Sequence, residues 1–291
     1  MSLKISGLTK TYKNGVKALD NVNLEIGNGM FGLLGPNGAG KSSLMRTIAT
    51  LQSPTSGSIM FNDINVLEDK NTLRKVLGYL PQEFGVYPNM SAEALLEYFA
   101  QLKGITNKVE RKAIIKEVLE LTNLYDVRKK SVSGYSGGMK QRFGIAQLLL
   151  NNPKLIIVDE PTAGLDPAER HRFLNVLREI GANHTVIFST HIVDDVRELC
   201  NNIAILNGGK ILFEGTPTSG EDMLEGKIWR RTIERDELDV YSTNHNIISS
   251  NFNPDNTLNI RVYSEVQPNE TFIKAVPVLE DVYFVSLKGD K

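Results

Sequence analysis

Four short runs of consecutive apolar residues recur along the first two thirds of the chain. They cover residues 30–34, 76–80, 155–158 and 185–188. Each run is too short for a typical helix, and strands that are buried on both faces carry such unbroken apolar runs. The pattern therefore predicts a parallel sheet that is covered on both faces.

The stretches between these runs follow other periods. Residues 3 to about 33 alternate apolar and polar positions between turn signals, which predicts an antiparallel β region before residue 34. A return to strand is expected at residues 59–61. Apolar residues at helical spacing, with Ser91 as an N-cap for the second segment, predict helices over residues 43–51, 92–97 and 112–121. We expect an α/β core with a helical insertion over about residues 88–151.

The composition changes near residues 214–220, where glycine, proline, serine and threonine gather and predict a turn-rich link. We place a domain boundary there, with a large domain over residues 1–220 and a small one over 221–291. The small domain carries an Asn-rich turn region at residues 251–256. Its strand-like stretches, which predict a small mixed α/β unit, lie at residues 227–233, 258–263 and 282–285.

Charge and cysteine content narrow the classes of function. The chain has 33 basic and 34 acidic residues, so its net charge of −1 gives no general attraction to nucleic acid. Cys200 is the only cysteine, which excludes an internal disulfide and a cysteine-based zinc cluster and favours a reducing compartment. Its apolar neighbours predict a small packed residue. Because the chain shows neither a signal-peptide core nor a run of about 18 apolar residues, we expect a cytoplasmic protein.

The clearest chemical motif follows the apolar run at residues 30–34. Residues 35–42 fit the pattern G-x-x-x-x-G-K-[ST] without a mismatch. Its glycines let backbone N–H groups turn inward around phosphate oxygens, and the helix expected to follow directs its positive end at the anion. Lys41 adds a charge for the β- and γ-phosphates, and Ser42 offers a hydroxyl to Mg²⁺. We expect a nucleoside triphosphate to bind at Gly35, Pro36, Asn37, Gly38, Ala39, Gly40, Lys41, Ser42 and Ser43.

A second set of motifs separates this chain from other phosphate-loop proteins. In chain order the set comprises Tyr-Ser-Gly-Gly-Met-Lys-Gln-Arg at residues 135–142, Asp159 and Glu160, Ala-Gly-Leu-Asp-Pro at residues 163–167, and His191. Together with the phosphate loop, these motifs closely resemble the nucleotide-binding subunit of an ABC transporter over about residues 1–220. The resemblance implies an α/β P-loop NTPase fold: an ABC ATPase core with an antiparallel β subdomain and a helical subdomain, followed here by a small C-terminal α+β appendage.

The expected catalytic residues are Glu160, His191, Gln82 and Lys41, and Asp159 is an expected ligand of Mg²⁺. Asp159 ends a predicted buried strand, where open α/β sheets place their ligands, and its carboxylate can hold Mg²⁺. The resemblance implies that Glu160 polarises the water that attacks the γ-phosphate, and that His191 senses this phosphate and orients the attack. Without this context, an Asp-Glu pair is usually a solvated surface feature and a lone histidine is usually structural.

The resemblance also implies roles for Gln82 and Tyr12. It implies that Gln82 contacts Mg²⁺ and the attacking water, and that it relays the nucleotide state to a membrane partner. Tyr12 matches an aromatic residue that stacks on adenine. Without their neighbours, Gln82 would be an ordinary loop residue and Tyr12 an ordinary strand residue. The surface around residues 82–90 is then the expected docking site for a coupling helix of the membrane partner.

The Ser-Gly-Gly segment predicts a partner chain. Ser136, Gly137 and Gly138 lead into a predicted helix, so their backbone N–H groups are free to meet an anion. In the family this segment contacts the ATP that the opposite subunit holds, so that two chains enclose two nucleotides. Asp166 matches the residue that communicates across that interface. The resemblance therefore implies a homodimer, or a pair with another ABC ATPase subunit.

The chain departs from the commonest family pattern at two positions. Tyr135 and Met139 stand where that pattern has leucine and glutamine. Loss of the glutamine removes a side-chain contact near the ribose, whereas the serine and glycine backbone donors remain. The Tyr-Ser-Gly-Gly-Met form is similar to that of ATPase subunits of bacterial exporters, and the segment at residues 279–283 also resembles the tail of that subgroup.

These observations lead to one main hypothesis. The chain is expected to bind ATP and Mg²⁺, dimerise on ATP, hydrolyse it, and power export through separate transmembrane permease subunits from the cytoplasmic face of the plasma (inner) membrane. The alternative is a soluble ABC ATPase that acts on the ribosome or DNA. Such relatives carry two cassettes, long coiled coils or zinc-binding cysteines, and we expect no specific nucleic-acid partner. A third possibility, a degenerate cassette, conflicts with intact Lys41, Asp159, Glu160 and His191.

Overall fold

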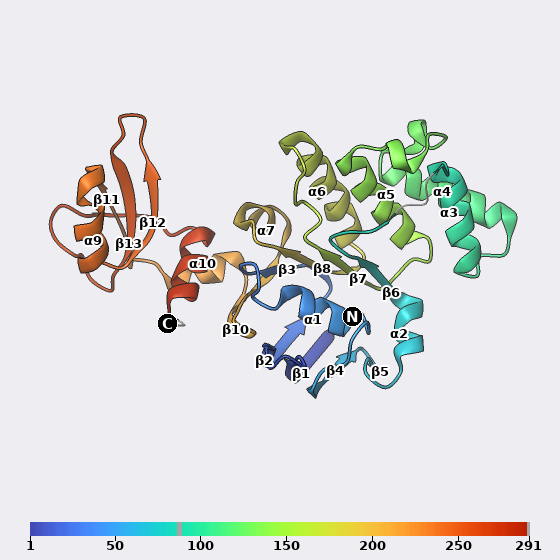
Figure 1. The fold of residues 1–291 in the computed structure, drawn as a ribbon, viewed down its shortest axis with the longest axis horizontal. Coiled ribbons are helices and arrows are strands. Elements are labelled where there is room, and N and C mark those ends of the chain that lie inside the picture. The colour runs from blue at the N-terminus through green and yellow to red at the C-terminus, as the bar shows by residue number, and fades with distance from the viewer. Residues whose placement is uncertain (86–88, 290–291) are drawn as a thin grey trace. The chain divides into compact units, whose positions relative to one another are not determined.

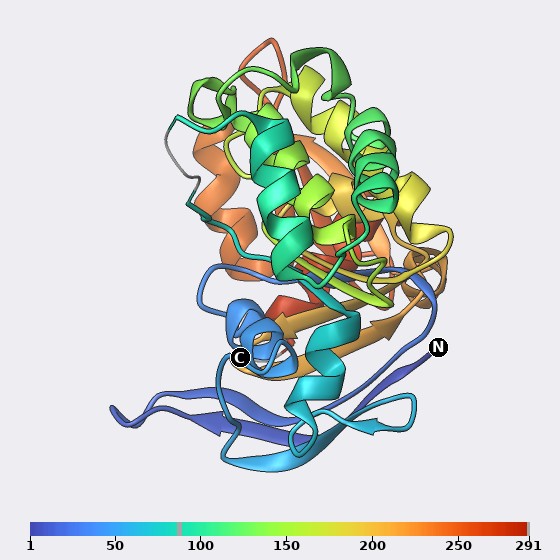
Figure 2. The same cartoon turned by 90° about the vertical axis from the view of Figure 1, so that its right-hand side faces the viewer.

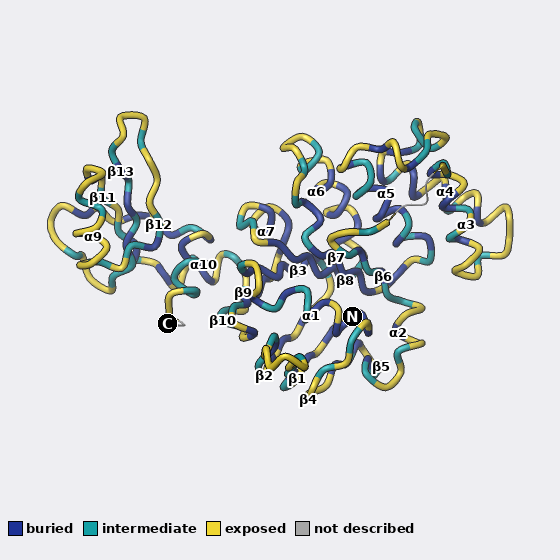
Figure 3. Tube along the Cα trace, in the orientation of Figure 1, coloured by how far each residue is buried: buried dark blue, intermediate teal, exposed yellow. Residues whose placement is uncertain are grey.

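The apolar runs of the sequence form the centre of a six-stranded sheet. A computed structural model describes residues 1–85 and 89–289. The sheet has the order β10-β9-β3-β8-β7-β6. Its strands are β3 (Gly29–Leu34), β6 (Leu77–Leu80), β7 (Leu155–Asp159), β8 (Thr185–Thr190), β9 (Asn202–Asn207) and β10 (Lys210–Gly215). Neighbouring strands pair in parallel along β3, β8, β7 and β6. Figure 3 shows β3, β7 and β8 as buried. The predicted buried parallel sheet is confirmed.

A second, antiparallel sheet precedes and follows the phosphate loop. Its order is β2-β1-β4-β5, with β1 (Leu3–Thr11), β2 (Lys17–Ile26), β4 (Ser56–Phe61) and β5 (Ile64–Asn65). Helix α1 (Lys41–Ile48) lies between this sheet and the six-stranded sheet in Figures 1 and 2, and α2 (Lys70–Val76) leads into β6. Before the phosphate loop, the antiparallel strands end with β2 and do not reach residue 33 as expected. The unbroken apolar run of β3 pairs in parallel with β8 instead.

The expected helical insertion is present. It contains α3 (Ala92–Leu102), α4 (Lys108–Leu121) and α5 (Gly137–Leu149), with short 3₁₀ turns η1 (Tyr125–Val127) and η2 (Val132–Gly134). The Ser91 hydroxyl accepts from the Ala94 N–H at 3.2 Å, which makes it the predicted N-cap of α3. The three helices share a core of buried apolar side chains, among them Leu95, Leu119 and Phe143. Residue 88, the predicted start of the insertion, lies outside the described residues.

Helices α6 (Pro167–Gly181) and α7 (Val193–Leu199) pack against the parallel strands. The packing of α7 on β3 is close: a Cβ added to Gly32 would lie 2.7 Å from Val196 Cγ1 and 3.1 Å from Cys200 Sγ. Cys200 is a free, buried thiol, and burial, aided by the Asp195 carboxylate, raises its pKa. The prediction that Cys200 is a small packed residue is confirmed.

Contacts divide the chain into two compact units. The first comprises Met1–Asn201 with Leu206–Ile211, and the second Asn202–Ile205 with Leu212–Lys291. The second unit contains an antiparallel sheet of order β12-β13-β11-β14 and a core that includes Ile233, Ile260 and Phe272. Its elements are α8 (Pro217–Met223), β11 (Ile228–Ile233), η3 (Arg235–Glu237), α9 (Leu238–Asn244), β12 (Ile247–Phe252), β13 (Leu258–Tyr263), β14 (Ile273–Lys274) and α10 (Leu279–Lys288). The domain limit at residue 220 stays a prediction.

Two local predictions for the second unit are wrong. Residues 282–285 belong to helix α10 rather than to a strand, because the Asp281 carboxylate accepts from the Val278 N–H at 2.9 Å and forms an ion pair with Arg261. The expected turn-rich link at residues 214–220 includes the start of helix α8, which Thr216 caps by accepting from the Ser219 N–H at 2.9 Å. In both places a capped start outweighs the short-range pattern.

Candidate functional site

The phosphate loop connects the end of β3 to the start of α1. Gly40 is the N-cap residue of α1, with φ 112° and no side-chain hydrogen bond to the first turn. A Cβ at this position would lie 2.4 Å from the Ala18 carbonyl oxygen, and one at Gly35 would lie 2.3 Å from that of Leu206. Both positions therefore require glycine, and the first N–H groups of α1 remain available to an anion.

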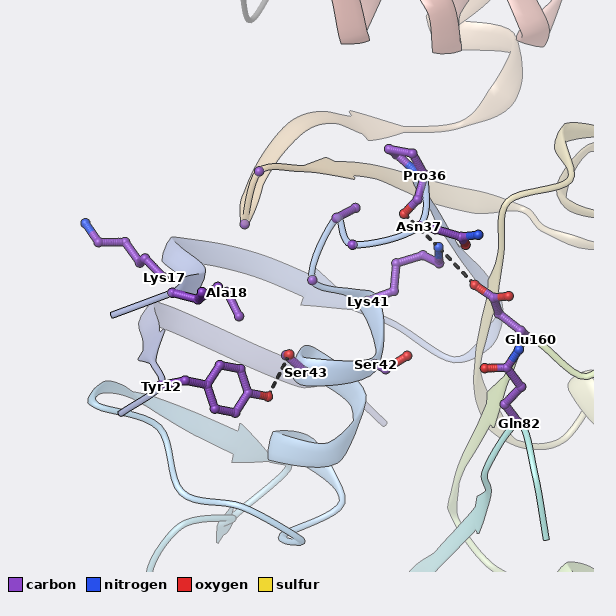
Figure 4. A pocket seen from close by; sticks show the side chains of 16 residues that line it. Tyr12, Lys17, Ala18, Pro36, Asn37, Lys41, Ser42, Ser43, Gln82 and Glu160 are labelled. Atoms are coloured by element: carbon purple, nitrogen blue, oxygen red, sulfur yellow. Dashed lines mark hydrogen bonds and ion pairs between the residues drawn. The ribbon is translucent and has the colours of Figure 1, made fainter. Parts of the chain in front are cut away.

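The ammonium group of Lys41 sits inside this loop. The side chain is only 4% exposed. Its Nζ donates to the carbonyl oxygens of Gly35 at 2.7 Å and Pro36 at 3.1 Å, and it lies 3.0 Å from Glu160 Oε1. Figure 4 shows Lys41 directed from α1 toward Glu160. A buried cation that reaches both the loop and a carboxylate is positioned to neutralise phosphate charge.

Two carboxylates stand at the end of β7. Asp159 is buried, and its Oδ1 accepts from the Ser189 hydroxyl at 2.7 Å. Glu160 follows with φ 46°, a left-handed conformation that is uncommon for a residue with a Cβ. Its Oε2 lies 3.4 Å from Nδ1 of His191, which comes from the end of β8 and is 45% exposed. The ends of two parallel strands thus bring Asp159, Glu160 and His191 together as the sequence predicted.

A cavity of about 520 Å³ opens beside these groups. Gln82 and Tyr12 line it, and the Tyr12 hydroxyl lies 2.9 Å from Ser43 Oγ and donates to Gln52 at 3.2 Å. Figure 4 shows Tyr12 on one side of α1 and Glu160 with Gln82 on the other. The other lining residues are Val16, Lys17, Ala18, Pro36, Asn37, Gly38, Ala39, Gly40, Lys41, Ser42, Ser43, Glu160, Gly208 and Gly209.

The Ser-Gly-Gly segment lies apart from the lining of this cavity. The Ser136 hydroxyl accepts from the Met139 N–H at 3.2 Å and caps α5. Gly138 packs against Glu169 of α6, since an added Cβ would lie 2.8 Å from the Glu169 Cβ. Glu169 in turn accepts from Arg142 at 3.1 Å, while Asp166 caps α6 by accepting from the Glu169 N–H at 2.9 Å. The structure therefore joins Ser136, Gly137, Gly138 and Asp166 in a second region around the starts of α5 and α6.

Comparison with known proteins identifies the family of the chain. A family model described as ABC transporter matches residues 19–163. The Bacillus subtilis (strain 168) protein "Uncharacterized ABC transporter ATP-binding protein YxlF" is 40% identical over 215 residues, 73% of this chain and 70% of that protein. "Methionine import ATP-binding protein MetN 1" of Oenococcus oeni is 38% identical over 221 residues, 74% of this chain and 63% of that protein.

Solved structures show the same fold. The structure of cbiO1 from Clostridium perfringens, part of the ABC transporter complex cbiONQ, matches with a TM-score of 0.69 at 28% identity and covers 75% of this chain and 89% of its own. The ATP-binding cassette MJ0796, a dimer bound to ADP and Pi, matches with a TM-score of 0.66 at 30% identity over 74% of this chain and 98% of its own. The chain belongs to the ABC transporter ATP-binding family. The predicted family, α/β fold and ATPase class are confirmed.

The names of the relatives do not establish the direction of transport for this ABC cassette. MetN 1 is named for import, whereas an Escherichia coli relative that is 34% identical is named "Probable multidrug ABC transporter ATP-binding protein YbhF". No helix within residues 1–85 and 89–289 is long and apolar enough to cross a bilayer. Export, the membrane partners and the roles of individual site residues stay predictions.

No sequence motif indicated several of the residues that line the cavity. Val16, Lys17 and Ala18 line the cavity beside Tyr12, and Gly208 with Gly209 closes it from the turn between β9 and β10. The paired glycines are a turn signal, but only the fold brings that turn next to the phosphate loop: the Gly209 N–H donates to the Ala39 carbonyl oxygen at 3.0 Å. Residues 86–88 of the expected docking segment lie outside the described residues.

Proposed function

We propose that this chain binds ATP in the cavity beside α1 and hydrolyses it there. The observation that carries the proposal is the meeting of three groups: Lys41 Nζ lies 3.0 Å from one Glu160 oxygen, and His191 Nδ1 lies 3.4 Å from the other. Backbone N–H groups within residues 37–43 receive the phosphates, and the Tyr12 ring at the far side of the cavity receives the adenine.

The proposed chemistry is in-line attack of a water on the γ-phosphate. Such transfer depends mainly on alignment and charge stabilisation. In our proposal Glu160, with 11% of its side chain exposed, accepts a hydrogen bond from the attacking water, and His191 fixes the orientation of Glu160. Lys41 stabilises the charge on the phosphate oxygens. Gln82, exposed on the loop after β6, contacts the water from the other side.

The residues of the site also suit Mg²⁺. This ion prefers oxygen ligands and is usually held by one or two carboxylates together with substrate phosphates. Ser42 at the start of α1 and Asp159 at the end of β7 offer a hydroxyl and a carboxylate, and the Gln82 amide adds an oxygen. Among the described residues no cluster of three or more His, Cys, Asp or Glu forms a complete metal site. A bound Mg²⁺ would supply charge neutralisation at the phosphates, with Ser42, Gln82 and Asp159 as its protein ligands.

The second region supports a dimer. Ser136, Gly137, Gly138 and Asp166 do not line the cavity, although helix starts such as that of α5 favour anions. We propose that they close over the ATP held by a second copy, or by a paired ABC ATPase subunit. The dimeric MJ0796 neighbour supports this arrangement. In our proposal the dimer sits at the cytoplasmic face of the plasma (inner) membrane and drives separate permease subunits, for export as the multidrug relative suggests.

The decisive experiment is Glu160→Gln. We expect ATP binding to persist while turnover falls by at least about 100-fold, so that an ATP-bound dimer accumulates in size-exclusion chromatography with Mg-ATP. Glu179→Gln, which changes an exposed carboxylate on α6, is the matched control and should behave as wild type. Unchanged turnover in Glu160→Gln would refute Glu160 as the catalytic carboxylate.

The transport role needs a separate test. The chain is to be purified from its native membranes under mild conditions, and the proteins that accompany it identified. A multi-span membrane protein in stoichiometric amount supports the role in transport. Ribosomal or DNA-bound partners in its place would contradict it, whatever the outcome for ATP hydrolysis.

A further inference from the structure

A serine on β8 bridges the two carboxylate residues at the end of β7. Ser189 is fully buried and stands opposite Asp159 in the parallel register of the two strands. Its hydroxyl lies 2.7 Å from Asp159 Oδ1 and 3.0 Å from the Glu160 backbone nitrogen. One side chain therefore touches the residue expected to hold Mg²⁺ and the peptide group of the residue expected to align water.

The directions of these two hydrogen bonds are fixed by their partners. A backbone N–H can only donate, so Ser189 Oγ accepts from Glu160. The hydroxyl proton is then free to point at Asp159, whose oxygen accepts it. Because the hydroxyl is bound at both ends inside a buried pocket, the Asp159 carboxylate has one oxygen held in place and its plane is restrained.

The same serine supports an uncommon backbone conformation. Glu160 has φ 46°, and a residue with a Cβ keeps such a conformation only where its surroundings hold it. The Glu160 N–H is shared between the hydroxyl of Ser189 at 3.0 Å and its carbonyl oxygen at 3.1 Å. This double contact fixes the direction in which the Glu160 side chain leaves β7, toward Lys41 and His191.

A second buried hydroxyl group on β8, that of Thr185, forms a hydrogen bond outside the proposed site. Thr185 at the opposite end of the strand is equally buried, and its Oγ1 donates to Asn28 at 3.4 Å, away from both carboxylates. Ser189 differs because its partners are the two acidic residues of the site. The strand therefore offers its own control for the loss of a buried hydroxyl.

We propose that Ser189 is a positioning residue for ATP hydrolysis, acting through Asp159 and Glu160. It orients the Asp159 carboxylate toward Mg²⁺ and holds the Glu160 peptide so that its side chain faces the γ-phosphate. The inference rests on the proposed function of the site. It predicts that the hydroxyl matters for the chemical step and for use of the metal, and little for the capture of ATP by the phosphate loop.

The test compares Ser189→Ala with Ser189→Thr, which keeps a hydroxyl, and with Thr185→Val, which removes another buried hydroxyl of β8. For Ser189→Ala we expect kcat to fall by about 10-fold or more, KM for ATP to change less than about threefold, and half-maximal activity to need more Mg²⁺. Binding of ATP in EDTA should match wild type. Ser189→Thr should recover most of the activity, and Thr185→Val should keep kcat and the Mg²⁺ requirement.

The possible results separate this inference from the proposal on which it rests. If wild type binds ATP without hydrolysing it, the proposed function fails. If wild type is active and Ser189→Ala keeps the wild-type kcat and Mg²⁺ requirement, the role of Ser189 is overturned. The role is also overturned if Thr185→Val loses as much activity as Ser189→Ala. Should Ser189→Ala fail to fold by thermal melting, Ser189→Cys, which keeps an unbranched side chain of similar shape but weakens the hydrogen bonds, replaces it with the same expected direction.

Discussion

Two helices of the cassette begin at glycine-rich segments, and their first turns are satisfied in different ways. Helix α1 starts after Gly40, whose lack of a side chain leaves the first N–H groups without a cap, inside a cavity of about 520 Å³. Helix α5 starts after Ser136, whose hydroxyl already accepts from Met139, and this segment does not line that cavity. The first N–H groups of α1 therefore have no side-chain cap and lie beside the cavity, whereas the Ser136 side chain caps α5 at the Met139 N–H.

The surroundings of the two helix starts extend this contrast. Near α1, the buried Lys41 reaches loop carbonyl oxygens and Glu160, so charge is concentrated at one point. Near α5, Gly138 packs against Glu169, whose carboxylate is held by Arg142, so the segment is fixed to α6. The comparison teaches that glycine serves two purposes here: it exposes N–H groups at α1 and permits close helix packing at α5.

The largest effect is expected at the α1 side. Lys41→Met keeps most of the side-chain volume but removes the charge that we propose to face the phosphates, so ATP affinity and turnover should both fall, with turnover reduced by about 100-fold or more. Equilibrium binding of a fluorescent ATP analogue and steady-state phosphate release measure the two effects. Wild-type affinity in this variant would contradict the central role given to the α1 region.

An intermediate effect is expected at the α5 side. In Gly138→Ala the new Cβ would lie 2.2 Å from Glu169 Oε2 and 2.8 Å from Glu169 Cβ, so the pair with Arg142 must shift. We expect turnover to fall by about 10-fold or more, while ATP binding at the phosphate loop stays within about twofold of wild type.

Gly134→Ala is the matched control for this prediction, because an added Cβ at Gly134 meets no atom within 4 Å. Thermal melting of both variants shows whether a loss of folding accounts for the effect. If Gly138→Ala lowers ATP binding as strongly as it lowers turnover, the two regions are not separable in the way the comparison requires.

The smallest effect is expected at Tyr12, which lines the cavity on the side of α1 away from Glu160 (Figure 4). Tyr12→Ala removes the ring and should weaken ATP binding by about 5- to 10-fold. Tyr12→Phe removes only the hydroxyl that contacts Ser43 and should stay within about twofold. Titration calorimetry distinguishes the two, and equal losses would show that the hydroxyl, rather than stacking, is what matters.

Much of the central fold was predictable because the relevant signals are local. The runs that became β3, β7 and β8 are unbroken and apolar, and only a strand between covered faces buries every residue of such a run. The phosphate loop and the order of the acidic residues likewise pointed to their place at the ends of these strands. The position of functional residues at strand ends can therefore be predicted where each strand is itself an unbroken apolar run.

Features that depend on contacts distant in sequence were less accessible. The strand expected at residues 282–285 is part of α10, where Arg261 of β13 pairs with Asp281 in the first turn. Nothing near residue 281 in the sequence indicates that partner. Ser189 was visible only as a neighbour of His191, since its contact with Asp159 arises from the register of β7 with β8.

The burial of Cys200 has a practical consequence. As the only cysteine of the chain, with a thiol packed against Gly32 and a raised pKa, it should stay unreactive toward maleimides and other thiolate-directed labels while the protein is folded. The folded wild-type chain should therefore take up no thiol-directed spectroscopic label. A single cysteine placed at an exposed position such as Ser133, close to the start of α5, would carry one probe per chain. The distance between two such probes would report the proposed closure of the dimer during turnover without any replacement in the core.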